Sequence, residues 1–122
     1  MRESLTLESK MSAVAEAAAK LRALCSSMGI AGGDVMLAEF CAVEAMGSAI
    51  AHGYGGKKGQ PVEVVVTLEG GALTLEVRDH GRAVPAARAA KLDIPPSTMK
   101  TVSFASNHGV NTLTLTKKVR VL

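Results

Sequence analysis

The sequence predicts an α+β fold: a two-layer sandwich in which helices pack on one face of a mixed, mostly antiparallel sheet. Three observations support this prediction. Residues 9–28 and 35–51 repeat apolar side chains with helical spacing. Residues 62–78 and 99–118 each contain two β-rich runs around a turn. A short alternating run at residues 4–8 precedes the helices and adds one more strand.

Capping residues set the expected bounds of the two helices. The first is predicted to begin at Ser9 or Ser12, either of which can act as the N-cap, and to stop at Gly29. Asp34 is the expected N-cap of the second helix, which ends at Gly53. The apolar side chains of the first helix fall on one side: Val14, Ala17, Ala18, Leu21, Leu24, Cys25 and Met28.

Turn residues define the two hairpins. Residues 69–71, Glu-Gly-Gly, join the strands of the first hairpin, and residues 106–109 join those of the second. Between the hairpins, residues 85–91 are rich in alanine and are expected to form two helical turns. Pro95 and Pro96 end this segment, because proline supplies no N–H and restricts the residue before it.

Composition places the chain among ordinary globular domains and excludes several functions. Its 122 residues suit a single domain, with 48% hydrophobic and 20% charged residues. The net charge of +3 is scattered, and aromatic residues are only 2% of the chain, so nucleic-acid binding is not indicated. No apolar run approaches the ~20 residues of a membrane span, and no signal peptide is evident. Cys25 and Cys41 occupy apolar helix positions and suit reduced core thiols in a cytoplasmic protein.

Two short motifs carry the polar residues with chemical potential. Residues 43–54 form an apolar helix with Glu44, Ser48 and His52 at four-residue steps. Such steps place the three side chains along one face, where they can address one site. The first hairpin then ends in the run Asp-His-Gly-Arg-Ala at residues 79–83.

This order of motifs resembles that of the anti-sigma-factor serine kinases of bacterial partner-switching systems, within the GHKL (histidine-kinase and gyrase type) ATPase superfamily. In that family the first motif runs Glu, three residues, Asn, three residues, His-Gly-Tyr, and the second is Asp-x-Gly-x-Gly. The resemblance covers nearly the whole chain and is best at residues 42–54, 62–81 and 102–118. It implies a shortened Bergerat-type ATP-binding fold in one domain over residues 1–122.

The resemblance assigns roles to five positions. Glu44 matches the catalytic glutamate, and Ser48 stands where the family has the asparagine that ligates Mg²⁺. Asp79 matches the aspartate that accepts a hydrogen bond from the adenine amino group. Gly81 matches the glycine that lets the base approach, and Ala83 replaces a second expected glycine. The site therefore departs from the family pattern at Ser48 and Ala83.

The larger departure lies after the second motif. The family there has a mobile lid and a Gly-x-Gly helix start whose backbone N–H groups hold the phosphates. In this chain no glycine lies between Gly81 and Gly109, so that phosphate cradle is absent from the sequence. The Gly-Gly-Lys-Lys-Gly run at residues 55–59 does not replace it, because it joins a helix to a strand.

Each of these residues also has a structural interpretation. Glu44 can be an ordinary helix carboxylate, Ser48 a small residue in close helix–sheet packing, and His52 a partner for terminal helix carbonyls. Asp79 and Gly81 can be turn residues that end a strand.

Two functions follow from the resemblance. One is a regulatory protein-binding domain of the anti-sigma-factor type, with ATP binding weak or lost and with no cofactor. Its partner would be a sigma factor or an anti-sigma antagonist, and a homodimer would bury the sheet face left open by the missing helix. The alternative is an active ATP-dependent serine-protein kinase that phosphorylates an antagonist, with Glu44 as base and Ser48 on Mg²⁺. A separate chain that completes the site is a third possibility.

Overall fold

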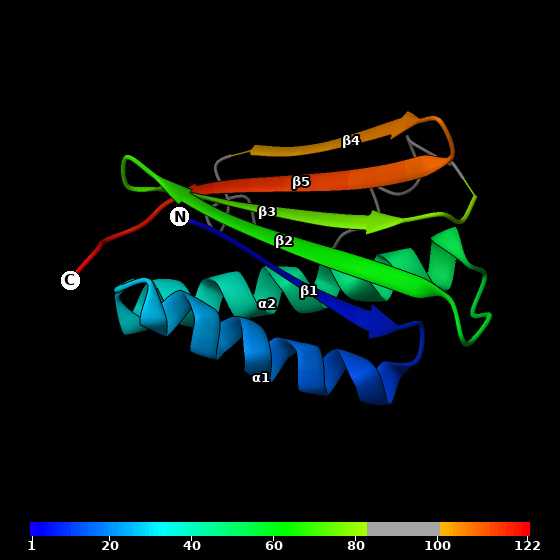
Figure 1. Ribbon diagram of the computed structural model, residues 1–122, viewed down its shortest axis with the longest axis horizontal. Coiled ribbons are helices and arrows are strands. Elements are labelled where there is room, and N and C mark those ends of the chain that lie inside the picture. Colours follow the sequence, from blue (N-terminus) through cyan, green and yellow to red (C-terminus); the bar gives the residue numbers. More distant parts are fainter. Residues whose placement is uncertain (83–100) are drawn as a thin grey trace.

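The predicted two-layer α+β sandwich is confirmed. The computed structural model describes residues 1–82 and 101–122. Within them, both helices lie on the same side of a five-stranded sheet (Figure 1). The elements are β1 (Arg2–Glu8), α1 (Met11–Ser27), α2 (Gly32–Ser48), the short π-helix η1 (Ala49–Gly53), β2 (Pro61–Glu69), β3 (Ala72–Asp79), β4 (Thr101–Asn107) and β5 (Val110–Lys118). The helical turns expected at residues 85–91 lie outside the described residues.

The sheet has the strand order β1-β2-β3-β5-β4, and each of these neighbouring pairs is antiparallel. The expectation of a mixed sheet is therefore wrong for the described strands. The reason lies in the connection from β1 to β2. Helix α1 runs back toward the end of the sheet where β1 started, and α2 returns (Figure 1), so β2 begins where β1 ended, with Glu8 opposite Pro61.

Both hairpins close at the turns that the sequence predicts. Gly70 and Gly71 have φ of 56° and 76°, and His108 and Gly109 have φ of 52° and 78°. Positive φ at both central residues matches the right-handed twist of the flanking strands. The two turns thereby fix the register of β2 on β3 and of β4 on β5.

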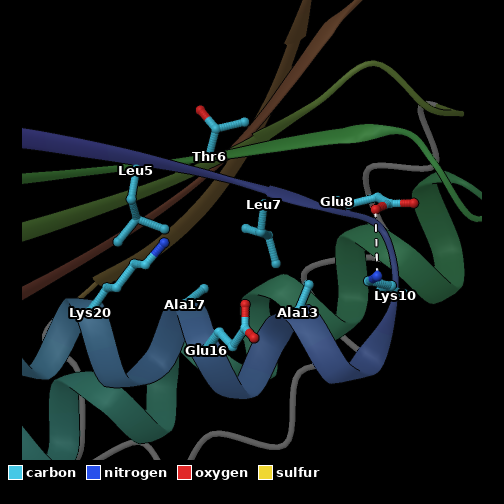
Figure 2. A pocket seen from close by; sticks show the side chains of 9 residues that line it. All are labelled: Leu5, Thr6, Leu7, Glu8, Lys10, Ala13, Glu16, Ala17 and Lys20. Carbon is cyan, nitrogen blue, oxygen red and sulfur yellow. Dashed lines mark ion pairs between the residues drawn. The ribbon is translucent and has the colours of Figure 1, made fainter.

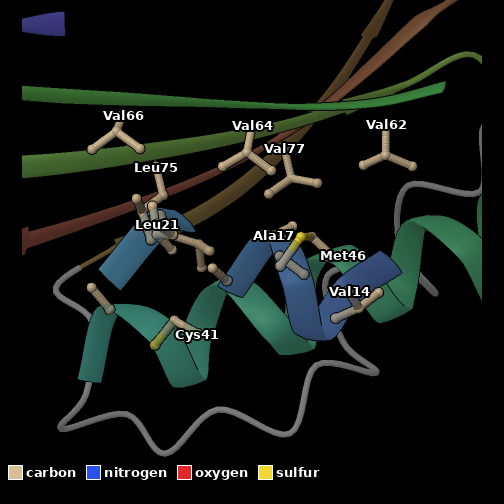
Figure 3. Close-up of a cluster of buried hydrophobic side chains, with 14 of the residues drawn as sticks. Val14, Ala17, Leu21, Cys41, Met46, Val62, Val64, Val66, Leu75 and Val77 are labelled. Carbon is tan, nitrogen blue, oxygen red and sulfur yellow. The ribbon is translucent and has the colours of Figure 1, made fainter. Parts of the chain in front are cut away.

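The core fills the space between the helices and the sheet. Figure 3 shows three valines of β2 with Leu75 and Val77 of β3, facing Leu21 of α1 and Met46 of α2. All of these side chains are buried. Cys25 and Cys41 are free, buried thiols, as predicted. Burial raises the pKa of each thiol to about 11, which keeps both protonated near neutral pH.

None of the predicted N-cap residues, Ser9, Ser12 and Asp34, caps its helix: Lys10 and Ala31 stand at the N-cap positions, without a capping side-chain bond. Ser9 is fully buried, and its Oγ donates to the Lys57 carbonyl at 2.6 Å and accepts from the Gln60 N–H at 2.9 Å. The Asp34 carboxylate accepts from the Arg120 N–H at 2.8 Å. Both side chains therefore tie helix starts to segments that are distant in the sequence.

The continuous helical stretch Gly32–Gly53 is long and apolar enough to cross a membrane by length and composition alone. The expectation that no apolar run approaches the length of a membrane span is therefore wrong for this stretch. Half of the stretch is buried inside the fold, and Ala38, Ala42 and Ala45 are fully buried. A core helix that is covered on one side by α1 and the sheet has this composition.

Candidate functional site

The three polar residues predicted on one helix face are spread over two kinds of helix. Glu44 is half-buried on α2, Ser48 is buried at its last position, and His52 is half-buried in η1. The wider π-helical turn changes the spacing after Ser48, so the uniform four-residue stacking ends there. Within the described part of the chain, no hydrogen bond joins the three, and the Ser48 Oγ has no hydrogen-bond partner.

Asp79 is held in a polar cluster that the sequence did not reveal. It ends β3 with its side chain fully buried. Its Oδ1 accepts from the Gly81 N–H at 2.9 Å and from the Asn111 Nδ2 at 2.9 Å. Asn111 lies opposite Asp79 on β5, is 1% exposed, and also donates to the Gly81 carbonyl at 2.9 Å. Asn111 therefore fixes both the carboxylate and the loop that follows it.

One sequence signal could have identified Asn111. Alternation along β5 places it on the same face as Leu113 and Leu115, which are core residues. A buried amide needs hydrogen-bond partners, and the residue paired with it across the sheet is Asp79. The pairing of β3 with β5 had to be known before this inference was possible.

Close packing within the fold requires a glycine at position 81. A Cβ at this position would lie 2.2 Å from both the carbonyl carbon and the oxygen of Gly53. The Arg82 N–H donates to that same oxygen at 2.6 Å. The loop after β3 thus packs directly on the end of η1, and this contact explains the glycine without a bound base.

The side chain of Tyr54 also contacts this loop. Its hydroxyl donates to the Pro61 carbonyl at 2.6 Å and accepts from the His80 N–H at 2.8 Å. The first motif, at the end of η1, and the second motif, at the end of β3, are therefore joined by the Tyr54 hydroxyl and by the main-chain bond from Arg82 to Gly53. The structure confirms that the two motifs are in contact. The side chains of Tyr54 and Asp79 form hydrogen bonds within the fold there.

These residues do not fit Mg²⁺ and adenine in the way that the family resemblance implies. Asp79 and the Ser48 Oγ are buried, and the close approach at Gly81 is taken by Gly53. The described residues contain no group of three or more His, Cys, Asp or Glu side chains that could hold a metal ion. Glu44 remains half-exposed, and Ala83 lies outside the described residues. The roles predicted for all five positions remain predictions.

Comparisons with known proteins place this geometry in a family. The family model of the histidine kinase-like ATPase domain matches residues 7–117. The fold is also similar to the crystal structure of the RsbU and RsbW domains of Rv1364c from Mycobacterium tuberculosis. That similarity has a TM-score of 0.74 at 23% identity and covers 98% of this chain, which spans 32% of the longer chain. No curated protein matches the sequence.

Proposed function

Because the chain belongs to the histidine kinase-like ATPase domain family, we propose that it is a regulatory protein-binding domain of the anti-sigma-factor type with weak or lost ATP binding. Its partner in this proposal is a sigma factor or an anti-sigma antagonist. The observation that carries the proposal is the closed cluster of Asp79, Asn111 and Gly81. These residues bond to one another at the position where the family resemblance implies that adenine binds.

Opening this cluster for a base has an energetic cost. A base that takes Asp79 Oδ1 would have to displace its two donors, each contributing about 1 kcal/mol net. A site that must first open by about 2 kcal/mol binds roughly thirtyfold more weakly than a preformed one. The sequence also lacks any glycine between Gly81 and Gly109 to expose main-chain amides to a triphosphate.

One observation favours the alternative, an ATP-dependent serine-protein kinase. Within the described residues the Ser48 Oγ has no hydrogen-bond partner, and half-exposed Glu44 lies one helical turn before it on α2. A hydroxyl without a partner is available to a cation if the surrounding residues move apart. The alternative therefore depends on a conformation in which Ser48 becomes accessible.

Calorimetric titration of the protein with ATP and Mg²⁺ separates the two functions. We expect no saturable micromolar binding, and the same small heats for wild type and Asp79→Asn. The asparagine keeps an oxygen that can accept from Asn111 and Gly81, so this variant is expected to fold like wild type. Micromolar binding by the wild type that is lost in Asp79→Asn would refute the proposal in favour of the kinase.

A second arm tests partner binding with a purified sigma factor and with a purified anti-sigma antagonist. We expect saturable binding that needs no nucleotide and is unchanged in Asp79→Asn. Binding that requires ATP would contradict the proposal. We also propose a cytoplasmic homodimer that uses exposed apolar side chains of α2 and β4. These are Leu37 at 38%, Phe40 at 44% and Val102 at 40% exposure.

A further inference from the structure

Two exposed lysines lie in the loop that joins η1 to β2. Residues 55–59 read Gly-Gly-Lys-Lys-Gly, and the side chains of Lys57 and Lys58 are both exposed. Figure 1 places this loop at the end of the sheet where β3 stops, away from both chain termini. A nucleotide phosphate loop follows a strand and opens a helix, whereas this run connects a helix to a strand. Nucleotide binding therefore does not explain the two charges.

The main chain of this loop is fixed by the rest of the fold. The Gly56 N–H donates to the Ile50 carbonyl at 2.9 Å. The hydroxyl of the fully buried Ser9 donates to the Lys57 carbonyl at 2.6 Å and accepts from the Gln60 N–H at 2.9 Å. The lysines therefore project from a preorganised main chain, and little conformational entropy of this loop is lost when a partner binds to it.

Arg82 adds a third positive charge to this surface. A Cβ built on Gly55 would lie 3.5 Å from the Arg82 Nη2, so the exposed guanidinium rests against the loop. The Arg82 N–H donates to the Gly53 carbonyl at 2.6 Å, and this bond fixes the backbone of Arg82 on the end of η1. We call Lys57, Lys58 and Arg82 the basic cluster.

The charges of the basic cluster are not balanced by the described part of the chain. None of the ion pairs among residues 1–82 and 101–122 includes a member of the cluster; their basic members are Lys10, Arg22, Arg78 and Lys117. The Glu8 carboxylate adjoins the loop, with its Oε1 3.9 Å from a Cβ built on Gly59, but it pairs with Lys10 at 3.6 Å (Figure 2). Like charges that gather without a counter-charge create a positive potential, which attracts an acidic partner.

We propose that the basic cluster docks an acidic segment of the protein partner, in which several aspartate or glutamate side chains lie close together. The inference rests on the proposed protein-binding function and adds the chemistry that the partner presents. Nucleic acid fits the cluster less well, because single strands bind by stacking on aromatic side chains. Tyr54, the aromatic residue nearest to the loop in sequence, is half-buried and bonds through its hydroxyl to Pro61 and His80.

Titration of the isotope-labelled chain with a short polyglutamate peptide, followed by NMR, tests this surface directly. We expect the amide resonances of residues 55–59 and 82 to shift at low salt, and the shifts to shrink at high salt because the charges are screened. Lys57→Glu combined with Lys58→Glu is expected to abolish the shifts. Lys118→Glu combined with Arg120→Glu is the matched control: it makes the same change in net charge at exposed residues near the far end of β5, and the shifts are expected to remain. No shift, shifts spread over all exposed lysines, or larger shifts with duplex DNA of equal charge would each refute the proposal.

Stopped-flow association with the purified sigma factor and the purified antagonist separates this inference from the proposed function. We expect the double variant at Lys57 and Lys58 to associate about tenfold more slowly than wild type at low salt, with a much smaller change in the dissociation rate, since exposed interface charges act mainly on the encounter. The double variant at Lys118 and Arg120 is expected to associate like wild type. Equal association rates for the two double variants refute the acidic docking site and leave the proposed function standing. If neither partner binds wild type, the proposed function is refuted, and the peptide titration alone decides the chemistry of the basic cluster.

Discussion

Replacing Gly81 by alanine tests the contact that joins the two motifs. The new methyl group would lie 2.2 Å from the carbonyl carbon and oxygen of Gly53 and 2.8 Å from its Cα. All three are main-chain atoms at the end of η1, so no flexible side chain can move away to relieve the overlap. The loop after β3 must move outward, and the 2.6 Å hydrogen bond from Arg82 N–H to the Gly53 oxygen is weakened with it.

The expected loss of stability follows from these two terms. Overpacking a close contact costs about 1–3 kcal/mol, and the hydrogen bond contributes about 1 kcal/mol more. Together they give a decrease of roughly 2–4 kcal/mol in the free energy of unfolding. For a domain of this size, that corresponds to a fall on the order of 10 °C in melting temperature. Urea unfolding followed by circular dichroism measures the change directly.

Gly47→Ala is the matched control. Gly47 lies inside α2, and a Cβ there would meet no heavy atom within 4 Å. Alanine favours a helix interior by about 0.5–1 kcal/mol over glycine, so this variant is expected to be slightly more stable than wild type. If Gly81→Ala unfolds at the same urea concentration as wild type, the contact with Gly53 is not the reason for the glycine. The alternative explanation, that Gly81 leaves room for a bound base, would then be favoured.

Two other predictions concern buried groups. Asn111→Leu removes a donor from the buried Asp79 carboxylate and is expected to lower the free energy of unfolding by about 2–3 kcal/mol. Most of this loss should disappear in a background that carries Asp79→Asn, as a double-mutant cycle would show. Burial raises the pKa of Cys25 and Cys41 from near 9 to about 11, so the folded state favours the neutral thiols. Their contribution to stability is therefore complete below pH 9 and is lost as the pH rises through about 11. The urea concentration at the midpoint of unfolding should fall over this pH range, and it should fall less in Cys25→Ala.

The features that the sequence predicts well are those determined by neighbouring residues. The hairpin turns follow from Gly70-Gly71 and from Gly109, and the apolar periodicity gives both helices. The predicted caps fail because the short polar side chains of Ser9 and Asp34 find partners far along the chain. Tertiary hydrogen bonds outweigh the local preference for capping at these positions. They join residues that are far apart in the sequence, so a local sequence pattern does not reveal them.

The same limit applies to the candidate site, and it bears on how the motifs are interpreted. Asp79 and Gly81 keep the residue types of a nucleotide-binding family, yet in this chain their immediate partners are Asn111 and Gly53. A buried carboxylate must be bonded to some donor, since leaving it without one costs several kcal/mol. Here an amide of the neighbouring strand supplies that donor. A motif can therefore persist because the fold needs its carboxylate and its glycine, and this need is independent of whether nucleotide binds.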